Sequence, residues 1–118
     1  MALNYFVLRV RSTLAVTMAS VCVLLGACGP TFKYVPTSEV TNEAREPTCE
    51  FRVLTTIPSN PFDEVGILQA DGSYRTSDVE EFKKIVAPDV CRAGGDAIIS
   101  EINGLGYYMR GTVIRYRR

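Results

Sequence analysis

Residues 77–102 read SDVEEFKKIVAPDVCRAGGDAIISEI, and they predict a helix, a glycine turn and then a strand. Ser77-Asp78-Val79-Glu80 has the form of a capping box, in which the Ser77 hydroxyl and the Glu80 carboxylate each cover an unpaired backbone N–H group. Four apolar residues recur at helical spacing, namely Val79, Phe82, Val86 and Val90. We expect these four side chains to pack on a sheet.

Pro88 complicates this helix, because proline removes a helical hydrogen bond and pushes Ala87 away from helical geometry. We expect a kink there, or a second short helix that begins near Pro88. Gly94-Gly95 ends the element, with Cys91 on the last turn. The helical element therefore lies between residues 77 and 95.

Runs of β-forming residues on both sides of the helix predict four strands. They cover residues 51–57, 62–70, 96–102 and 108–116. In the first strand, one face carries Phe51, Val53, Thr55 and Ile57. A glycine-rich turn of hairpin type joins the last two strands. We predict an α+β fold, a small ββαββ domain with a mostly antiparallel sheet and one helix on one face.

The N-terminal segment is organised differently. Arg9 and Arg11 are the only charged side chains of the first 28 residues, and they precede twelve uncharged residues, 14–25. A membrane-spanning helix needs roughly 20 apolar residues, so this run is too short to span a bilayer comfortably. It fits the apolar core of an export signal with a positive flank before it.

Leu25-Gly26-Ala27-Cys28 follows this run and resembles the lipobox of bacterial lipoproteins. The resemblance implies that residues 1–27 are a cleaved signal peptide. It also implies that Cys28 takes a diacylglycerol on its sulfur and an acyl chain, such as palmitate, on its new amino group. Several acyl chains on one residue give stable membrane anchoring. A secretory signal, or an uncleaved membrane helix with an incidental cysteine, is the alternative.

Residues 28–48 contain three prolines and scattered Thr, Ser and Glu, and we interpret them as the lipidated anchor and a flexible tether. A flexible coil of this length separates its ends by about 25 Å. Phe32, Tyr34 and Val35 leave two alternatives open, an extra edge strand or a contact with the membrane interface. Gly29 replaces the aspartate that retains lipoproteins at the inner membrane of enteric bacteria, which favours the outer membrane.

Cys49 and Cys91 are the two cysteines of the domain expected over residues 49–118. An exported domain meets an oxidising compartment, so we expect one disulfide between them, worth about 4 kcal/mol in the chain-entropy model. A redox or metal pair is the alternative. However, neither cysteine lies in a Cys-x-x-Cys pair, and the chain has no histidine. We therefore expect no metal and no cofactor.

Gly94-Gly95-Asp96-Ala97-Ile98-Ile99, between the helix and the hairpin, resembles the small α+β domains of the Rcs-sensor lipoprotein and the YbjQ-like proteins. The similarity covers residues 49–118. Gly94 can serve as a left-handed helix cap, and Ala97 is small enough for the sheet to approach the helix end. The Rcs-type sensor has more cysteines in its domain. The resemblance therefore implies a fold and contacts with envelope proteins, but not stress signalling.

The last strand supplies a candidate partner face. In a regular strand one face would carry Tyr108, Arg110, Thr112, Ile114 and Tyr116. Tyrosine and arginine are frequent at binding hot spots, so we hypothesise that Tyr108, Arg110 and Tyr116 contact a partner protein. An ordinary amphipathic strand is the alternative. We therefore expect a membrane-anchored, non-catalytic binding, sensing or structural module of the cell envelope.

Other functions find less support in the sequence. After residue 28, eleven Lys and Arg stand against thirteen Asp and Glu, so the net charge is about −2 and no nucleic-acid partner is expected. A glycan hydrolase is an alternative, because Asp63-Glu64 and Glu80-Glu81 supply paired carboxylates. Adjacent acids point in different directions, however, and no nucleophile activated by histidine can form. The missing histidines also argue against the third alternative, binding of a metal or small ligand.

Overall fold

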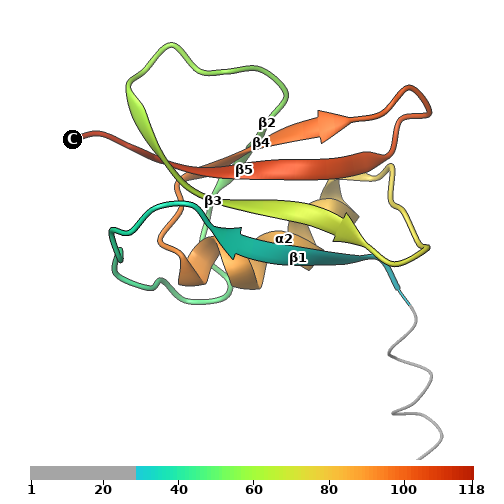
Figure 1. Ribbon diagram of the computed structural model, residues 1–118, viewed down its shortest axis with the longest axis horizontal. Coiled ribbons are helices and arrows are strands. Elements are labelled where there is room, and N and C mark those ends of the chain that lie inside the picture. The colour runs from blue at the N-terminus through green and yellow to red at the C-terminus, as the bar shows by residue number, and fades with distance from the viewer. Residues whose placement is uncertain (1–28) are drawn as a thin grey trace, which may run out of the picture.

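The computed structural model describes residues 29–118, in which five strands form one sheet and one helix covers a face of it (Figure 1). In chain order the elements are β1 (Thr31–Pro36), β2 (Arg52–Leu54), β3 (Phe62–Asp71), α2 (Val79–Arg92), β4 (Ala97–Ile102) and β5 (Tyr108–Tyr116). The predicted α+β class, with one helix and a mostly antiparallel sheet, is confirmed. The predicted signal peptide, residues 1–27, and the predicted acylation site, Cys28, lie outside the described residues.

The strand order across the sheet is β1-β3-β5-β4-β2, with β5 at the centre. Three of the pairings are antiparallel, and the pairing of β2 with β4 is parallel. β2 and β3 lie on different sides of β5. The connection of residues 55–61 therefore has to pass across β4 and β5 to reach β3.

This crossing makes β2 shorter than the strand predicted over residues 51–57. Phe51 is buried next to β2, but Thr55 is exposed and Ile57 is 75% exposed. The Ser100 hydroxyl of β4 donates a 2.8 Å hydrogen bond to the Leu54 carbonyl, at the last residue of β2. Beyond Leu54 the chain leaves the edge of the sheet. Residues 55–57 therefore form no strand, although their residue types alternate as in one.

β1 occupies part of the segment predicted as a flexible tether, and that prediction was wrong for residues 31–36. All six residues of β1 pair antiparallel with β3. The Phe32 ring packs edge-on against Phe82, with ring centroids 5.2 Å apart. The Tyr34 ring lies over Gly66, where any larger side chain would collide with it. Burial of these two rings offsets the entropy lost on ordering the segment.

The helix begins at Val79, because Asp78 rather than Ser77 is its N-cap. The Asp78 carboxylate accepts hydrogen bonds from the backbone N–H groups of Glu80, at 2.8 Å, and Glu81, at 3.2 Å. An ionised carboxylate at this position also interacts favourably with the helix dipole. The predicted capping box of Ser77 and Glu80 is therefore wrong. Val79 is 42% exposed and lies outside the core, contrary to the prediction.

Pro88 lies inside one continuous helix, so the second helix expected near it is absent from the described residues. Proline cannot donate a hydrogen bond to the carbonyl of Lys84, one turn earlier. Both residues are on the exposed side of α2, where water can pair with that carbonyl. The exposed position explains why the helix tolerates this residue.

The helix ends in a Schellman motif. The Gly95 N–H donates to the Val90 carbonyl at 2.9 Å, and the Gly94 N–H donates to the Cys91 carbonyl at 3.1 Å. Gly94 has a φ of 73°, in the left-handed region that favours glycine. The predicted role of Gly94 as the helix cap is confirmed.

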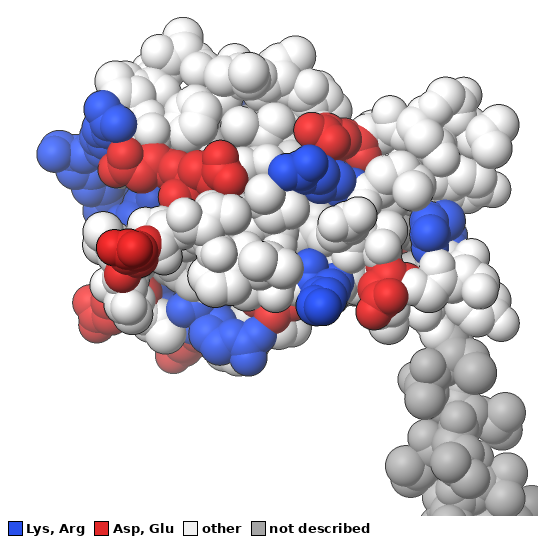
Figure 2. Space-filling view, viewed as in Figure 1, with Lys and Arg blue, Asp and Glu red and all other residues white. Residues whose placement is uncertain are grey.

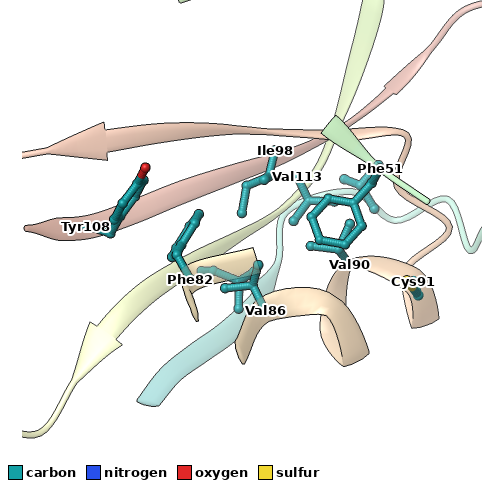
Figure 3. Close-up of a cluster of buried hydrophobic side chains, with 10 residues drawn as sticks. Phe51, Phe82, Val86, Val90, Cys91, Ile98, Tyr108 and Val113 are labelled. Carbon is teal, nitrogen blue, oxygen red and sulfur yellow. The ribbon is translucent and has the colours of Figure 1, made fainter. Parts of the chain in front are cut away.

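The core lies between α2 and the sheet. Phe82, Val86 and Val90 are fully buried, as their helical spacing predicted. Phe82 stacks on Tyr108 of β5, with ring centroids 4.3 Å apart. Figure 3 shows this pair at one end of the cluster, and Phe51 beside Val90 at the other.

Candidate functional site

The sheet face opposite α2 carries one partly exposed residue from each strand. Side chains that point toward the helix, such as Leu68 and Val113, are buried in the core, so their neighbours along each strand point to the opposite face. Strand pairing aligns five of these neighbours across the sheet, in the order Val35, Ile67, Thr112, Ile99 and Leu54. We call this set the apolar row.

The apolar row remains accessible in the folded domain. Val35, at the β1 edge, is 48% exposed, and the other four members are half-buried. A neighbouring line on the same face is polar or charged, and consists of Lys33, Gln69, Arg110 and Glu101. In Figure 2, uncharged surface lies between groups of charged side chains of both signs. An apolar centre with a polar border is typical of protein-binding surfaces.

The partner face predicted on the last strand does not form as expected, because β5 contains a bulge near its start. The register shifts between Glu101 opposite Arg110 and Ile102 opposite Tyr108, which leaves Met109 as an extra residue. Tyr108 therefore points into the core and is 6% exposed, whereas Arg110 is exposed on the other face. The prediction that Tyr108 and Arg110 share a face is wrong.

Tyr116, the third residue of the predicted partner face, lies at the far end of β5. It is half-buried, and Ile114, two residues earlier on the same face, is fully buried. Ala97 lies opposite Ile114 in β4 and is fully buried too. This end of the helix-free face is therefore covered, and the apolar row is the part that stays accessible.

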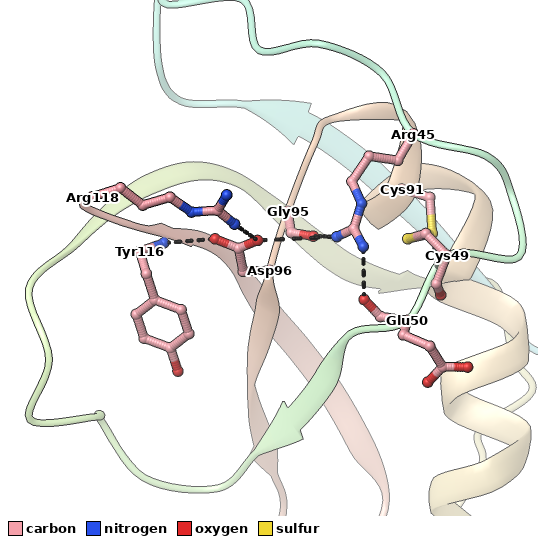
Figure 4. Close-up of polar contacts among 8 residues, drawn as sticks. All are labelled: Arg45, Cys49, Glu50, Cys91, Gly95, Asp96, Tyr116 and Arg118. Carbon is pink, nitrogen blue, oxygen red and sulfur yellow. Dashed lines mark hydrogen bonds and ion pairs between the residues drawn. A yellow bond between two sulfur atoms is a disulfide. The ribbon is translucent and has the colours of Figure 1, made fainter.

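A polar cluster attaches the segment before β2 to the C-terminal end of α2 (Figure 4). The Arg45 guanidinium donates hydrogen bonds to the carbonyls of Gly95, at 2.9 Å, and Glu50, at 3.2 Å. The Arg45 backbone N–H donates to the Cys91 carbonyl at 2.8 Å. A cation beside these carbonyls also meets the negative end of the helix dipole. Arg45 therefore fixes the chain around residue 45 against the helix end.

Asp96 is the acidic centre of the same cluster. Its Oδ2 accepts a 2.9 Å hydrogen bond from the Tyr116 backbone N–H, and its Oδ1 lies 3.6 Å from the Arg118 guanidinium and 4.0 Å from that of Arg45. A hollow of about 390 Å³ lies beside these side chains. Because donors of the protein itself hold the carboxylate, the cluster acts as a structural connection between the end of β5 and the helix end.

The predicted disulfide between Cys49 and Cys91 is confirmed, with the two Cα atoms 5.8 Å apart. It joins the last turn of α2 to the segment that leads into β2. Phe51, two residues further on, is buried, and the Lys83 ammonium lies 5.4 Å from the centroid of its ring. The bridge therefore holds the beginning of β2 against the helix.

The two pairs of adjacent carboxylates have separate structural contacts. Arg117 binds Asp63 through two nitrogens, at 2.9 Å and 3.0 Å. Glu64 is the next residue in β3 and points to the other face of the sheet. Glu81, at the helix start, accepts a 3.0 Å hydrogen bond from the Thr76 hydroxyl. None of these contacts forms the facing pair of acids that glycan hydrolysis requires.

Tyr34 is a half-buried tyrosine where β1 packs against α2. Burial raises the pKa of its hydroxyl above the ordinary value of 10.0. The negative charge of Asp89 raises this pKa further, whereas the positive charge of Arg92 lowers it. These two side chains form an ion pair with each other on α2. The neutral hydroxyl is therefore the form that suits the junction of β1 and α2.

The apolar row was not predicted from the sequence, although part of its signal is present there. Residues 65–68 and 97–99 are apolar without alternation, which indicates strands that are apolar on both faces. Val35 was interpreted as part of the tether, with an edge strand as one of the alternatives, and it lies in the edge strand β1. Its place in the row, like that of Leu54, depends on strand pairings that no local pattern specifies.

Comparison of the chain with protein-family models, with curated proteins and with solved structures gives no match. Within residues 29–118, no group of three or more His, Cys, Asp or Glu side chains is placed to hold a metal ion. No helix in this described part of the chain is both long and apolar enough to cross a membrane. The resemblances to lipoproteins, to the Rcs-sensor domain and to the YbjQ-like proteins therefore stay predictions from the sequence.

Proposed function

We propose that the protein is an exported, lipid-anchored protein of the bacterial envelope, and that its domain is a non-catalytic module that binds another envelope protein through the apolar row. The motif of residues 25–28 supports acylation of Cys28. The disulfide between Cys49 and Cys91 supports export, because disulfides persist in oxidising compartments. Gly29, in place of an aspartate, supports the outer membrane as the destination.

The apolar row is the observation that carries the binding role. α2 covers one sheet face, and a sheet has to bury its second face or expose side chains compatible with water. The row instead leaves four aliphatic side chains and the threonine between them partly exposed in the middle of that face, from Val35 on one edge to Leu54 on the other. Contiguous exposed apolar surface with a polar border marks interaction sites. The neighbouring Lys33, Arg110 and Glu101 favour a protein partner with charges of both signs.

The anchor is tested by the intact mass of the protein isolated from its native membranes, before and after reduction. We expect a chain that begins at Cys28 and carries acyl mass, with a gain of two hydrogen atoms when the disulfide is reduced. An unacylated chain that begins elsewhere would contradict the anchor. Free Cys49 and Cys91 thiols in the isolated protein would contradict the oxidising compartment.

The binding surface is tested with Ile67→Arg, which places a charge in the apolar row between Val35 and Thr112. Ile57→Arg is the matched control, because Ile57 is 75% exposed and lies outside the sheet. Each variant is expressed in the native host, and crosslinking in intact cells is followed by identification of the linked envelope protein. We expect Ile67→Arg to reduce the crosslinked product roughly tenfold or more, since losing one buried aliphatic contact is worth more than 1.4 kcal/mol.

Thermal unfolding of both variants separates binding from folding. The proposal requires Ile67→Arg to unfold near the wild-type temperature while its crosslinked product is lost. If Ile67→Arg and Ile57→Arg both retain the crosslinked product, the apolar row is not the binding surface. If the two variants lose the product equally, the contact is not specific to the row.

A further inference from the structure

One end of the domain gathers the start of β1 and two connections between elements. Thr31, the first residue of β1, pairs with Asp71, the last residue of β3. The connection of residues 72–78 leaves β3 at this end, and the hairpin of residues 103–107 joins β4 to β5 beside it. Figure 1 shows both connections and the start of β1 at the right-hand end of the domain.

Exposed large apolar side chains concentrate at this end. Among residues 29–118 there are eight such side chains, and five of them lie here. They are Leu105, Tyr74, Ile102, Val79 and Tyr107, exposed by 80%, 60%, 44%, 42% and 37%. Isolated exposed apolar residues are normal on a protein surface, but a concentration at one end marks an interaction site. We call these five residues the apolar end.

Asn103 fixes the hairpin that presents the most exposed of these side chains. Its side-chain oxygen accepts hydrogen bonds from the backbone N–H groups of Leu105 and Tyr107, both at 3.0 Å. Its backbone N–H donates to the Tyr107 carbonyl at 2.9 Å. Backbone groups that already have a hydrogen-bond partner in the protein cost less free energy when they move from water to an apolar environment. The N–H groups of Leu105 and Tyr107 are therefore already paired when the hairpin enters an apolar environment.

The predicted acylation site lies close to the same end in the sequence. Only Gly29 and Pro30 separate Cys28 from Thr31, where β1 begins. Three residues of extended chain span at most about 11 Å. An acylated Cys28 would therefore hold the apolar end at the membrane surface, and not about 25 Å above it as a tether of twenty residues would.

We infer that the apolar end inserts into the interface of the membrane to which Cys28 is anchored, an inference that rests on the proposed acylation. Leu105, at the hairpin tip, enters the upper part of the acyl chains, where its apolar surface leaves water. Tyr74 and Tyr107 lie at the level of the headgroups, because a tyrosine ring is apolar while its hydroxyl stays hydrated. The lipid anchor and the protein surface then contact the same bilayer.

Apolar burial, rather than charge, accounts for this contact. The charged side chains of the connection between β3 and α2 have both signs, with Arg75 before the helix and Asp78 at its N-cap. Glu80 and Glu81 follow in the first helical turn. Such a surface gains little from anionic lipid. Vesicles of neutral phosphatidylcholine are therefore a sufficient test membrane.

The sequence contains no tryptophan, which allows a direct test with one inserted indole. Leu105→Trp places the indole at the apolar end. Ile57→Trp is the matched control, because Ile57 is 75% exposed, against 80% for Leu105, and lies in the connection between β2 and β3. Each acylated variant is inserted into phosphatidylcholine vesicles. Tryptophan emission is then recorded with and without lipids that carry bromine on their acyl chains, which quench only indoles near the bilayer.

In the vesicles we expect the emission maximum of Leu105→Trp at a shorter wavelength than that of Ile57→Trp. We also expect the brominated lipid to quench the Leu105→Trp emission several-fold more strongly. Water-like emission from Leu105→Trp, or equal quenching of both variants, would overturn the inference. Flotation of the vesicles and intact mass report the anchor independently. An acylated protein that floats with water-like emission overturns insertion alone, whereas an unacylated protein overturns both insertion and the proposed anchor.

Discussion

Tyr108 stacks face to face on Phe82, with ring centroids 4.3 Å apart and an interplanar angle of 11°. The stack exists because the bulge at Met109 turns Tyr108 toward the helix, away from the face that carries Arg110. It links the first turn of α2 to the beginning of the central strand. A residue predicted to contact a partner is therefore part of the core.

Tyr108→Ala should lower the free energy of unfolding by about 3–4 kcal/mol, because it removes a buried aromatic ring and leaves a cavity. Tyr108→Phe keeps the stacked ring and should cost less than about 1 kcal/mol. Arg110→Ala changes an exposed side chain and should change stability by less than about 0.5 kcal/mol. Urea denaturation measures all three. Equal effects of Tyr108→Ala and Arg110→Ala would contradict the bulged register.

The bridge between Cys49 and Cys91 joins residues 42 positions apart, which is almost half of the described chain. Cys49→Ser combined with Cys91→Ser should lower the free energy of unfolding by about 4 kcal/mol, because the unfolded chain regains the entropy of an open loop. Denaturation of the double variant and of the reduced wild-type protein measures this loss, and the two should agree. A loss below about 1 kcal/mol would show that the bridge adds little to the contacts around it.

Gly94 combines a left-handed backbone with crowded surroundings. A Cβ atom there would lie 2.8 Å from the Glu43 carbonyl oxygen and 2.9 Å from the Asn42 side chain. Gly94→Ala should therefore cost more than the roughly 1–2 kcal/mol of left-handed strain alone. Gly106→Ala is the control for that strain, since Gly106 has a φ of 86° and open space around its Cα.

Denaturation of the two glycine variants separates backbone strain from packing. Gly94→Ala should lower the free energy of unfolding more than Gly106→Ala does. The difference between the two measures the steric conflict between a side chain at residue 94 and residues 42 and 43. Gly104→Ala, at an open position without positive φ, should be nearly neutral. If Gly94→Ala and Gly106→Ala lose the same stability, residues 42 and 43 do not press on the helix cap.

The raised pKa of Tyr34 predicts how stability changes in alkaline solution. Above pH 10.0 the tyrosine of the unfolded chain loses its proton, while the folded protein still retains it because of burial and the negative charge of Asp89. The unfolded state then binds fewer protons, so the free energy of unfolding falls as the pH rises. Below the unfolded pKa this contribution is fully present. The sign of this pH dependence of stability follows from the raised pKa of Tyr34.

Tyr34→Phe removes the titrating hydroxyl while it keeps the ring over Gly66. Denaturation of the wild type and the variant between about pH 8 and pH 11 should show a steeper loss of stability in the wild type. Both proteins share every other titrating group, so the difference between the two curves isolates Tyr34. Parallel curves over this range would contradict the predicted shift.

Local sequence patterns predicted the helix and the last strand correctly. The spacing of Phe82, Val86 and Val90 predicted the buried side of the helix, and Gly94 predicted its end. The strand predicted over residues 108–116 has the observed bounds. These features depend on neighbours within a few residues, so the sequence alone carries the information.

Other local patterns are compatible with two structures, and the sequence does not distinguish between them. Ser77 and Asp78 are both good N-caps, and the buried Thr76 fixes the choice, since its hydroxyl accepts a 3.2 Å hydrogen bond from the Asp78 N–H. The aromatic residues of the segment 31–36 suit either an edge strand or a contact with membrane. Only the presence of β3 and of Phe82 beside them decides for the strand.

The sequence by itself determined the fold class, the helix and the pairing of Cys49 with Cys91, because each follows from short-range periodicity or from the number of candidates present. The tertiary structure alone decided the order of the strands, the parallel pairing of β2 with β4 and the bulge in β5. Strand pairing joins residues far apart in the chain, and one extra residue reverses every side chain beyond it. For that reason the apolar row and the apolar end could be found only once the sheet was assembled.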